Sequence, residues 1–407
     1  MTSKVAAPET DFVVPGGFRW AGVPAGIKYK DRRDLGLCVA DGGACPTAAV
    51  FTQNRFAAAP VLVSRQNLKA GGNRASGIVV NAGCANAATG DEGMSSARTM
   101  AEQGAAASGK EDGNFLVCST GTIGVQLPME RISGGIEAAS KVAASTRQAF
   151  MDFATSILTT DTRHKIASAE IVVEDKRARI LACAKGSGMM QPKMATMLAF
   201  VFTDVVVDSS VLQQSLSRAI EHSLNCMTVD GDTSTNDTTF LMASGASGLA
   251  LTEAKAQAAF DSALLQVLQS ISKQLARDGE GASKLIEIEV KGAPDFLSAR
   301  NAALTIGNSP LVKTAIYGRD ANWGRIAMAL GNTGLSFQVE DVSIRLGDLE
   351  LFRRGAPLPL DEEAALKVLA EEFVRIEVEV GAGNGSATIW TCDLTEKYIE
   401  INGSYRT

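Results

Sequence analysis

The residues with the clearest potential for chemistry lie in one stretch, from Lys185 to Phe202. It begins with a lysine and a glycine-containing loop and ends in an apolar, strand-like run, and Thr196 lies where the two meet. A threonine hydroxyl is a poor nucleophile unless a base is adjacent, and a freed α-amino group is such a base, with an unperturbed pKa near ~8. We therefore predict that Thr196 is a catalytic nucleophile and that the chain cuts itself after Ala195 to expose this amine.

The scarcity of histidine favours a base of this kind. The chain has only His164 and His222, too few to support histidine-based triads or multi-histidine metal sites. His222 falls on a predicted amphipathic helix and has a structural interpretation, whereas His164 follows a threonine cluster and leaves a role in the site open. A threonine at the start of a strand is also commonplace, so the local pattern alone leaves a structural role for Thr196 open.

Three further positions have a functional and a structural interpretation each. The run from Ser119 to Thr122 ends a buried strand and can point N–H groups and a hydroxyl at a developing oxyanion, or it is an ordinary strand-to-helix turn. Lys185 suits binding of a carboxylate, or it is a solvated strand end. Glu280 lies in a loop that could simply close a helix through Gly279 and Gly281.

Other binding motifs are weak. The sequence contains no phosphate loop of the G-x-x-x-x-G-K-[ST] type, and Pro192 would break the helix that such a loop requires after Gly186 to Gly188. The oxygen-rich run from Asp230 to Asp237 resembles a calcium loop but lacks the glycine and late glutamate at the proper spacing. We interpret it as a polar turn or a loop that supports a site, and we predict no metal site. A nucleotide-binding module stays a weak alternative.

The elements that must position these residues alternate between strands and helices. Residues 13–48 are predicted as strands and turns, residues 48–52 and 60–64 as further strands, and Gly77–Asn86 and Phe115–Cys118 as buried strands. A hairpin is expected over residues 170–183. Long helices are expected over residues 94–109, 128–158, 208–225, 252–277, 296–306, 310–317 and 361–373. This alternation predicts an α/β or α+β layered protein.

The composition is that of an ordinary globular enzyme. The 407 residues are 45% hydrophobic and 21% charged, with a net charge of −6, so the chain can form two or three domains. Because it has no basic stripe and only 5% aromatic residues, nucleic acid is an unexpected partner. Seven scattered cysteines without a C-x-x-C pair suit a reducing compartment. No signal peptide or membrane span is recognisable, so we expect a cytoplasmic protein without a membrane partner.

The motifs taken together resemble the ornithine acetyltransferase family, also called glutamate N-acetyltransferase, which acts in arginine biosynthesis. The resemblance covers about Pro15 to Thr407. It rests on Lys185–Gly188, Pro192, the Met194–Leu198 cleavage motif, Ser119–Gly121, Thr159–Thr162, Val229–Asp237, Arg277–Ala282, Asp320–Arg325 and Tyr405–Thr407.

The resemblance implies a transferase with a two-domain fold that is cut into two associated chains, residues 1–195 and 196–407, with a smaller C-terminal domain from about residue 290. These chains would form an α2β2 heterotetramer. It implies that acetyl moves from N²-acetylornithine to L-glutamate through an acetyl-Thr196 intermediate, in a ping-pong mechanism without a cofactor. Thr120 and Gly121 are then the oxyanion hole. The expected substrate-binding residues are Thr160, Lys185, Thr196, Glu280, Asn402 and Thr407.

Alternatives remain at this stage. A bifunctional variant would also take acetyl from acetyl-CoA to make N-acetylglutamate, and no recognisable CoA signature decides between the two. An amidohydrolase with an N-terminal nucleophile would release acetate to water. A non-catalytic binding module would stay a single chain of about 42.6 kDa. Within the threonine cluster, Thr159, Thr160 and Thr162 compete for the role of substrate contact.

Overall fold

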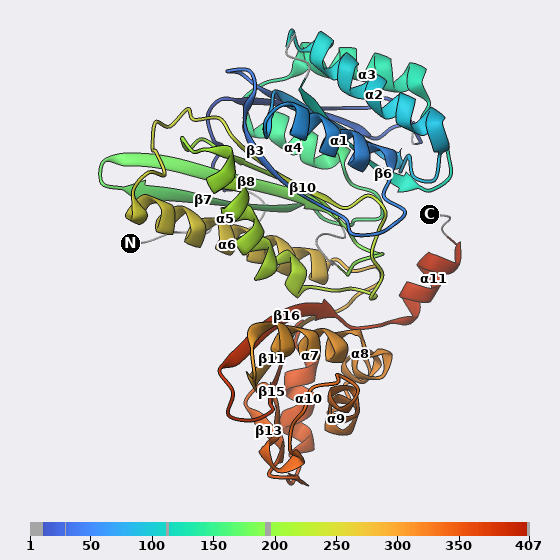
Figure 1. The fold of residues 1–407 in the computed structure, drawn as a ribbon. Coiled ribbons are helices and arrows are strands. Elements are labelled where there is room, and N and C mark those ends of the chain that lie inside the picture. The colour runs from blue at the N-terminus through green and yellow to red at the C-terminus, as the bar shows by residue number, and fades with distance from the viewer. Residues whose placement is uncertain (1–10, 29, 111–113, 192–196, 405–407) are drawn as a thin grey trace.

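The computed structural model describes residues 11–28, 30–110, 114–191 and 197–404 (Figure 1). Ala195, Thr196 and Thr407, which the sequence assigns to the cleavage point and the site, lie outside the described residues. The described residues form three sheets with helices packed on their faces, which confirms the predicted layered α/β class.

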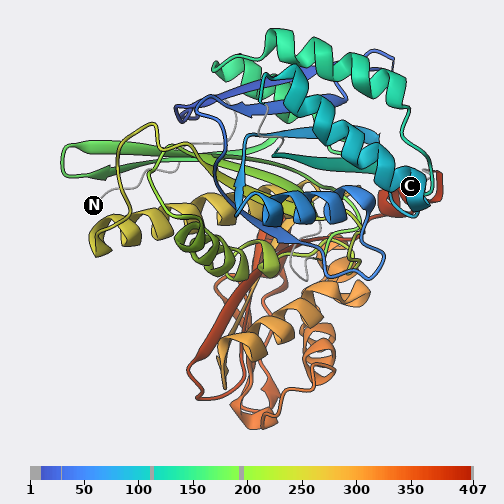
Figure 2. The same ribbon diagram turned by 45° about the horizontal axis from the view of Figure 1, so that its top comes forward.

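The first sheet has four strands in the order β1-β2-β5-β6. Its strands are antiparallel except for the pair β5 and β6, which is parallel. Helices α2 and α3 pack on one of its faces, and α4 packs on β1 and β2 (Figure 2). The elements are β1 (Phe18–Val23), β2 (Leu35–Ala40), β5 (Gly77–Cys84), β6 (Phe115–Thr122), α1 (Ala59–Ala70), α2 (Gly90–Ala107), α3 (Met129–Val142) and α4 (Arg147–Ser156).

The second sheet has six strands in the order β4-β3-β10-β9-β8-β7. Strand β9 lies in its middle, antiparallel to β8 and parallel to β10. Helices α5 and α6 cover the face that points away from the first sheet (Figure 1). The elements are β3 (Cys45–Phe51), β4 (Arg74–Ala75), β7 (Lys165–Val173), β8 (Lys176–Lys185), β9 (Leu198–Thr203), β10 (Thr238–Ala243), α5 (Ser209–Glu221), the 3-10 turn Leu224–Cys226 and α6 (Ala254–Arg277).

The third sheet has six strands in the order β14-β13-β12-β15-β11-β16 and lies beneath the first two in Figure 1. Helix α7 packs on β11 and β16, and the last helix, α11, leaves this sheet and reaches back toward the larger layers. The elements are β11 (Leu285–Ala293), β12 (Ser343–Leu346), β13 (Leu349–Arg353), β14 (Ala356–Pro357), β15 (Phe373–Glu379), β16 (Gly385–Cys392), α7 (Phe296–Asn308), α8 (Pro310–Tyr317), α9 (Trp323–Gly331), the 3-10 turn Val339–Asp341, α10 (Glu362–Ala370) and α11 (Glu396–Ser404).

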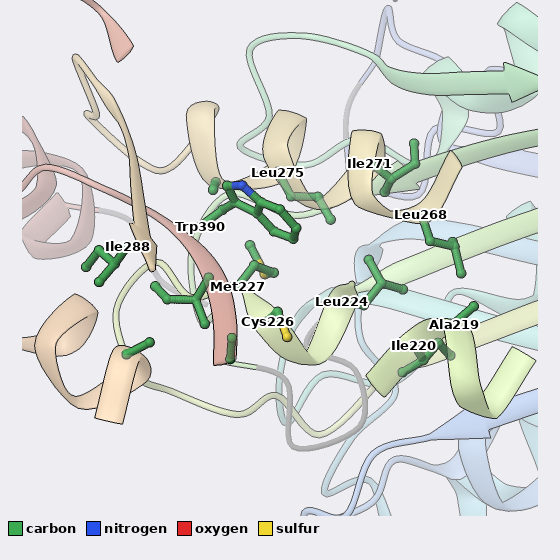
Figure 3. Packing of buried hydrophobic residues seen from close by; sticks show 14 of the residues in the cluster. Ala219, Ile220, Leu224, Cys226, Met227, Leu268, Ile271, Leu275, Ile288 and Trp390 are labelled. Carbon is green, nitrogen blue, oxygen red and sulfur yellow. The ribbon is translucent and has the colours of Figure 1, made fainter. Parts of the chain in front are cut away.

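One apolar core joins the second and third sheets. Figure 3 shows Trp390 of β16 beside Leu275 of α6 and Met227, and all three belong to one cluster of buried residues. A second core fills the space between the first two sheets and includes Phe200 and Phe202 of β9. Strand β9 is buried along its whole length, so the residues at its start are held by packing on both faces.

The predicted elements are recovered with a few exceptions. Residues 60–64, predicted as a strand, belong to helix α1, because Pro60 is tolerated in the first turn of a helix, where its missing N–H has no partner to lose. The long helix predicted over residues 128–158 is two helices, α3 and α4. Helices α9 and α11 were not predicted. The predicted division into domains at residue 195 and near residue 290 stays a prediction.

Candidate active site

One pocket lies where the ends of β6 and β8 meet the start of β9. Its lining comes from eight separate segments of the chain, which shows why no single motif could define it. The lining residues are Ala85, Thr120, Gly121, Ile123, Thr159, Thr160, Lys185, Gly188, Met189, Met197, Leu198, Asp230, Asp232, Ser234, Thr235, Asn236, Asp237, Glu280, Tyr398 and Asn402.

The structure brings all six described candidate residues into this pocket: Thr120, Gly121, Thr160, Lys185, Glu280 and Asn402. Of the competing threonines, Thr159 and Thr160 both line it. The hydroxyl and N–H of Thr162 are instead bonded to Asp278. The sequence alone could not decide which of these threonines lines the pocket, because the conformation of the turn that contains them sets the direction of each side chain.

The predicted nucleophile precedes the first described residues of β9. Met197, to which Thr196 is bonded, lines the pocket together with Leu198. In the register of β8 and β9, Lys185 pairs with Leu198. The loop that carries the predicted cleavage point therefore starts and ends at the same edge of the second sheet.

Lys185 links the second sheet to the first. Its ammonium donates a hydrogen bond to Oγ1 of Thr120 at 2.7 Å and lies 3.3 Å from Oγ1 of Thr159. Burial lowers the pKa of Lys185, and the carboxylates of Asp161 and Asp237 oppose this shift. A partly buried ammonium beside Thr120, a candidate residue of the oxyanion hole, is well suited to bind a substrate carboxylate.

Two glycines allow close approach at the pocket. Gly121 has φ +128°, and a Cβ there would lie 2.3 Å from the carbonyl carbon of Gly83 on the neighbouring strand. A Cβ on Gly188 would lie 2.3 Å from Oε2 of Glu280. A side chain at either position would push apart the segments that form the wall, which explains the glycines in both loops.

Helix α11 closes one side of the pocket. Nδ2 of Asn402 donates to Oε2 of Glu280 at 2.8 Å, and the Tyr398 hydroxyl lies 3.2 Å from Oδ2 of Asp230. Both contacts join the C-terminal helix to loops of the larger layers. Glu280 is only 9% exposed and presents a carboxylate to the pocket, an arrangement that fits a cationic amine.

A buried ion network holds three of the lining loops. The ammonium of Lys165, on β7, contacts Oδ1 of Asp161 at 2.5 Å and also Oδ2 of Asp278. Oδ1 of Asp161 accepts a hydrogen bond from the Gly186 N–H at 2.7 Å, and its other oxygen accepts one from the Thr159 N–H. Burial raises the pKa of Asp161, but the ammonium groups of Lys165 and Lys185 outweigh it, so the pKa is about 2.

The oxygen-rich run from Asp230 to Asp237 forms a wall of the pocket, in agreement with its interpretation as a loop that supports a site. Asp230 accepts hydrogen bonds from the N–H groups of Met189 and Met190 at 2.7 and 2.8 Å. Nδ2 of Asn236 donates to the carbonyls of Ala85 and Ser119, at the ends of β5 and β6. The run therefore ties the two sheets together at the site.

Sequence reasoning missed the residues that hold this pocket together. Asp161, Lys165 and Asp278 make the ion network, and Tyr398 docks α11. Their only sequence signal was an Asp within the threonine cluster and a charged residue at the end of a predicted helix. Neither pattern indicates a partner more than a hundred residues away.

The two histidines lie elsewhere. His164 is 2.9 Å from the hydroxyl of Thr155, and the His222 ring lies 4.2 Å from the Phe296 ring, which agrees with its structural interpretation. Neither is among the lining residues given above. All seven cysteines are buried free thiols. They pack in the interior as small apolar residues.

Comparison with known families decides the assignment. The model of the ArgJ family matches residues 19–407. The chain belongs to the ArgJ family. This confirms the resemblance drawn from the motifs and, with it, the predicted enzyme class, glutamate N-acetyltransferase of arginine biosynthesis.

Curated relatives agree over the whole length. The chain is 45% identical over 408 residues to the "Arginine biosynthesis bifunctional protein ArgJ" of Chlorobaculum tepidum, covering 100% of both chains. It is 46% identical over 397 residues to the protein of the same name from Symbiobacterium thermophilum, covering 97% of this chain and 98% of that one.

Solved structures resemble parts of the chain. A crystal structure of the ArgJ protein of Bacillus halodurans is 44% identical with a TM-score of 0.49, covering 50% of this chain and 96% of that one. Ornithine acetyltransferase of Mycobacterium tuberculosis, solved in complex with ornithine, is 34% identical with a TM-score of 0.44, covering 48% of this chain and 100% of that one. In the part of the chain that the structure describes, no helix has the length and apolarity of a membrane span.

Proposed function

We propose that this ArgJ-family chain cuts itself between Ala195 and Thr196 and then transfers acetyl from N²-acetylornithine to L-glutamate. Thr196 is the nucleophile of the first half-reaction, and its oxygen is the leaving group of the second. The observation that carries the proposal is the convergence of Thr120, Lys185 and Glu280 from three segments into the pocket lined by Met197, the residue bonded to Thr196. An anion-binding and a cation-binding group at one reaction centre match a substrate that carries both charges.

In the first half-reaction, Oγ of Thr196 attacks the acetyl carbonyl carbon, and its proton passes to the freed α-amino group of the same residue. The carbonyl oxygen becomes an oxyanion, which the hydroxyl of Thr120 and the N–H of Gly121 stabilise. Donors of this kind contribute about 3–4 kcal/mol each. The C–N bond then breaks, the α-ammonium returns the proton to the leaving amine, and ornithine departs from an acetyl-Thr196 ester.

In the second half-reaction, the amine of glutamate attacks the ester carbonyl carbon and loses a proton to the α-amino group of Thr196. The tetrahedral adduct collapses with release of the Thr196 oxygen, which regains the proton. N-acetylglutamate departs, and the free hydroxyl is restored. Because an oxyanion forms on the acetyl carbonyl oxygen in both half-reactions, the same donors serve both steps.

Substrate recognition follows from charge. Lys185 binds the substrate carboxylate, while Glu280 binds the δ-ammonium of ornithine. Asn402 supports Glu280 through their hydrogen bond at 2.8 Å. Thr160 completes the wall beside Lys185. Thr407, outside the described residues, is proposed as a further contact near the end of α11.

We propose that the cut yields segments 1–195 and 196–407, with a smaller C-terminal domain from about residue 290. The two chains stay associated as an α2β2 assembly in the cytoplasm. The β8–β9 pairing of Lys185 with Leu198 supports this association, because the cut falls within the loop between the two strands. The reaction as written needs neither metal nor cofactor.

Thr196 is tested by two substitutions. We expect Thr196→Ala to leave one intact chain without turnover, whereas Thr196→Ser keeps part of the cleavage and part of the activity, because its hydroxyl is retained. Intact mass and N-terminal sequencing of purified protein report the cut, and a coupled assay for ornithine release reports turnover. Efficient cleavage of the alanine variant would refute the assignment.

A second activity is favoured by the word "bifunctional" in the names of the relatives. We propose that the enzyme also accepts acetyl-CoA and forms N-acetylglutamate from it. The test supplies acetyl-CoA as the sole donor with glutamate as acceptor. Formation of N-acetylglutamate in the wild type but not in Thr196→Ala supports one shared nucleophile. Acetate release at the transfer rate without an acceptor would instead indicate an amidohydrolase.

A further inference from the structure

Asp237 is a buried carboxyl that the proposed mechanism does not use. It lies directly before β10, is 1% exposed and lines the active-site pocket. The side chain and the backbone of Ser234 hydrogen-bond to its carboxyl group. Its Oδ2 is buried and has no hydrogen-bond partner among the described residues. Burying a carboxyl oxygen without a hydrogen-bond donor costs free energy. We therefore expect a donor at the reaction centre that can pair with it.

Strand register locates this carboxyl relative to the nucleophile. β9 and β10 are parallel, Thr238 pairs with Leu198, and the Thr238 N–H donates to the Met197 carbonyl at 2.9 Å. Extending the register by one residue sets Asp237 beside Met197, at the ordinary spacing of about 4.8 Å between neighbouring strands. Asp237 therefore neighbours Met197, the residue that follows Thr196 in the chain.

The cation whose charge acts on Asp237, Lys185, is hydrogen-bonded to other groups. The Lys185 ammonium makes its hydrogen bonds to the hydroxyls of Thr120 and Thr159. Burial raises the pKa of Asp237 well above its usual range, and the contacts with Ser234 and the charge of Lys185 only partly oppose this. The uncut chain offers a peptide N–H at residue 196, whereas the cut chain offers an amine that can carry a full positive charge.

We propose that Asp237 is the partner of the α-amino group that cleavage creates at Thr196, and that it stabilises the ammonium formed each time this amine takes the nucleophile's proton. Asp237 thus completes a three-membered arrangement of hydroxyl, amine and carboxylate. It acts as a positioning residue, because it works through the amine rather than on the substrate. This inference rests on the proposed function of Thr196.

The pH dependence has a definite sign. A carboxylate next to an ammonium favours the charged form and raises the amine's pKa, so removing the carboxylate lowers it. Because the amine must be neutral to act as a base, activity rises with pH through its pKa. The other charged groups around this part of the pocket are Lys185, Asp161, Asp230, Asp232 and Glu280. Of these groups, Lys185 also responds to Asp237, because this carboxylate raises the pKa of the Lys185 ammonium. The shift of the profile is therefore assigned to the Thr196 amine together with direct labelling of that amine.

The deciding variant is Asp237→Asn, which keeps the shape and removes the charge. We expect normal cleavage, because no α-amine exists before the cut, and a fall in kcat of about 10²-fold, within the range for a lost acid–base contribution. We also expect the rising limb of the kcat–pH profile to move to lower pH. Asp237→Glu, which restores a carboxylate, should recover part of kcat and move the limb back.

Thr239→Val is the matched control. Thr239 is a buried β10 residue two positions further on, its hydroxyl has no partner among the described residues, and it does not line the pocket. This isosteric change tests whether any alteration at this edge of β10 disturbs activity. We expect wild-type cleavage, kcat and pH profile.

Each outcome decides the inference. Wild-type kcat and pH profile in cleaved Asp237→Asn overturn it, and so does an uncleaved Asp237→Asn, because the carboxyl would then act before the amine exists. If that variant does not fold, competitive labelling of wild-type Thr196 with fluorodinitrobenzene, read by mass spectrometry across pH, decides instead. An amine pKa above ~8, its unperturbed value, supports the pairing and a value below it overturns the pairing. Absence of a chain starting at Thr196 in the wild type is a failure of the proposed function instead.

Discussion

In the proposed function, Glu280 recognises the δ-ammonium of the donor substrate. It is almost fully buried, and the hydrogen bond from Asn402 holds its Oε2 at 2.8 Å. A charge-assisted hydrogen bond to such a carboxylate contributes about 1.5–3 kcal/mol. We therefore expect this interaction to be strong enough for the enzyme to distinguish a donor that carries a δ-ammonium from one that does not.

We predict that Glu280→Gln raises KM for N²-acetylornithine by about 10–100-fold and changes kcat much less, because the lost interaction is with a part of the substrate that does not react. Steady-state kinetics of ornithine release measure this.

N-acetylnorvaline, which has the same carbon chain without the amine, is the matched control donor for Glu280. With this donor, the variant and the wild type should have similar KM values. An equal loss with both donors would show that Glu280 supports the fold of the pocket rather than the recognition of the amine.

At the scale of elements, the loops that line the pocket are held by buried ion pairs whose residues do not themselves line it. The Asp161 carboxylate accepts hydrogen bonds from the N–H groups of Thr159 and Gly186 and forms an ion pair with Lys165. One carboxylate thus fixes the threonine turn against the end of β8. Removing one member of a buried ion pair is more damaging than replacing the whole pair, because it leaves an uncompensated charge.

This network predicts an acid-sensitive contribution to stability. The folded-state pKa of Asp161 is about 2, below the usual value of 3.8. A depressed pKa stabilises the fold at pH values above 3.8, and this contribution, about 2 kcal/mol, is lost as the pH falls from about 4 to about 2. In Asp161→Asn we expect lower stability at pH 7 and a gap to the wild type that narrows over this window. Denaturant titrations at several pH values measure the gap.

Asp41→Asn provides the comparison for the acid effect. Asp41 forms an exposed ion pair with Arg19 at 2.7 Å. Exposed pairs contribute little, so this variant should follow the wild type throughout. A gap for Asp161→Asn that stays constant with pH would contradict the assignment of the low pKa to the buried carboxylate.

Sequence patterns predicted elements well where burial is uniform. Strands β5 and β9 are buried along their whole length and read as continuous apolar runs. Residues 60–64 misled the prediction because their valines are typical of strands, while the deciding feature is a proline in the first turn of a helix. Helix α11 has no fully buried residue, so no apolar stripe marks it.

The site was predictable in part. The residue types suggested the chemistry at Thr196, which stays a prediction. The resemblance supplied Glu280 and Asn402, and both line the pocket. The ion network and Asp237 could not be predicted, because their roles depend on the pairing of distant strands. The register of β9 with β10 gives Asp237 its neighbour, and no local pattern encodes that register.

At the scale of the molecule, the predicted cut separates residues that must work together. Thr120 and Lys185 precede the cut, while Glu280 and Asn402 follow it, yet all four line one pocket. Strand β9 contributes to the middle of the second sheet, between β8 from before the cut and β10 from after it. Breaking one peptide bond in the connecting loop removes none of the hydrogen bonds between these strands.

We therefore predict that the cleaved chains remain one particle under native conditions. The fully buried β9 and the core it shares with the first sheet would have to be exposed to separate them, at about 25 cal/mol for each Å² of apolar surface. A denaturing gel should show two bands, while size-exclusion chromatography with light scattering should show a single species. Its mass should be that of whole αβ units, and twice one unit for α2β2. Separation of the two chains without denaturant, with activity retained by either one alone, would contradict a site built across the cut.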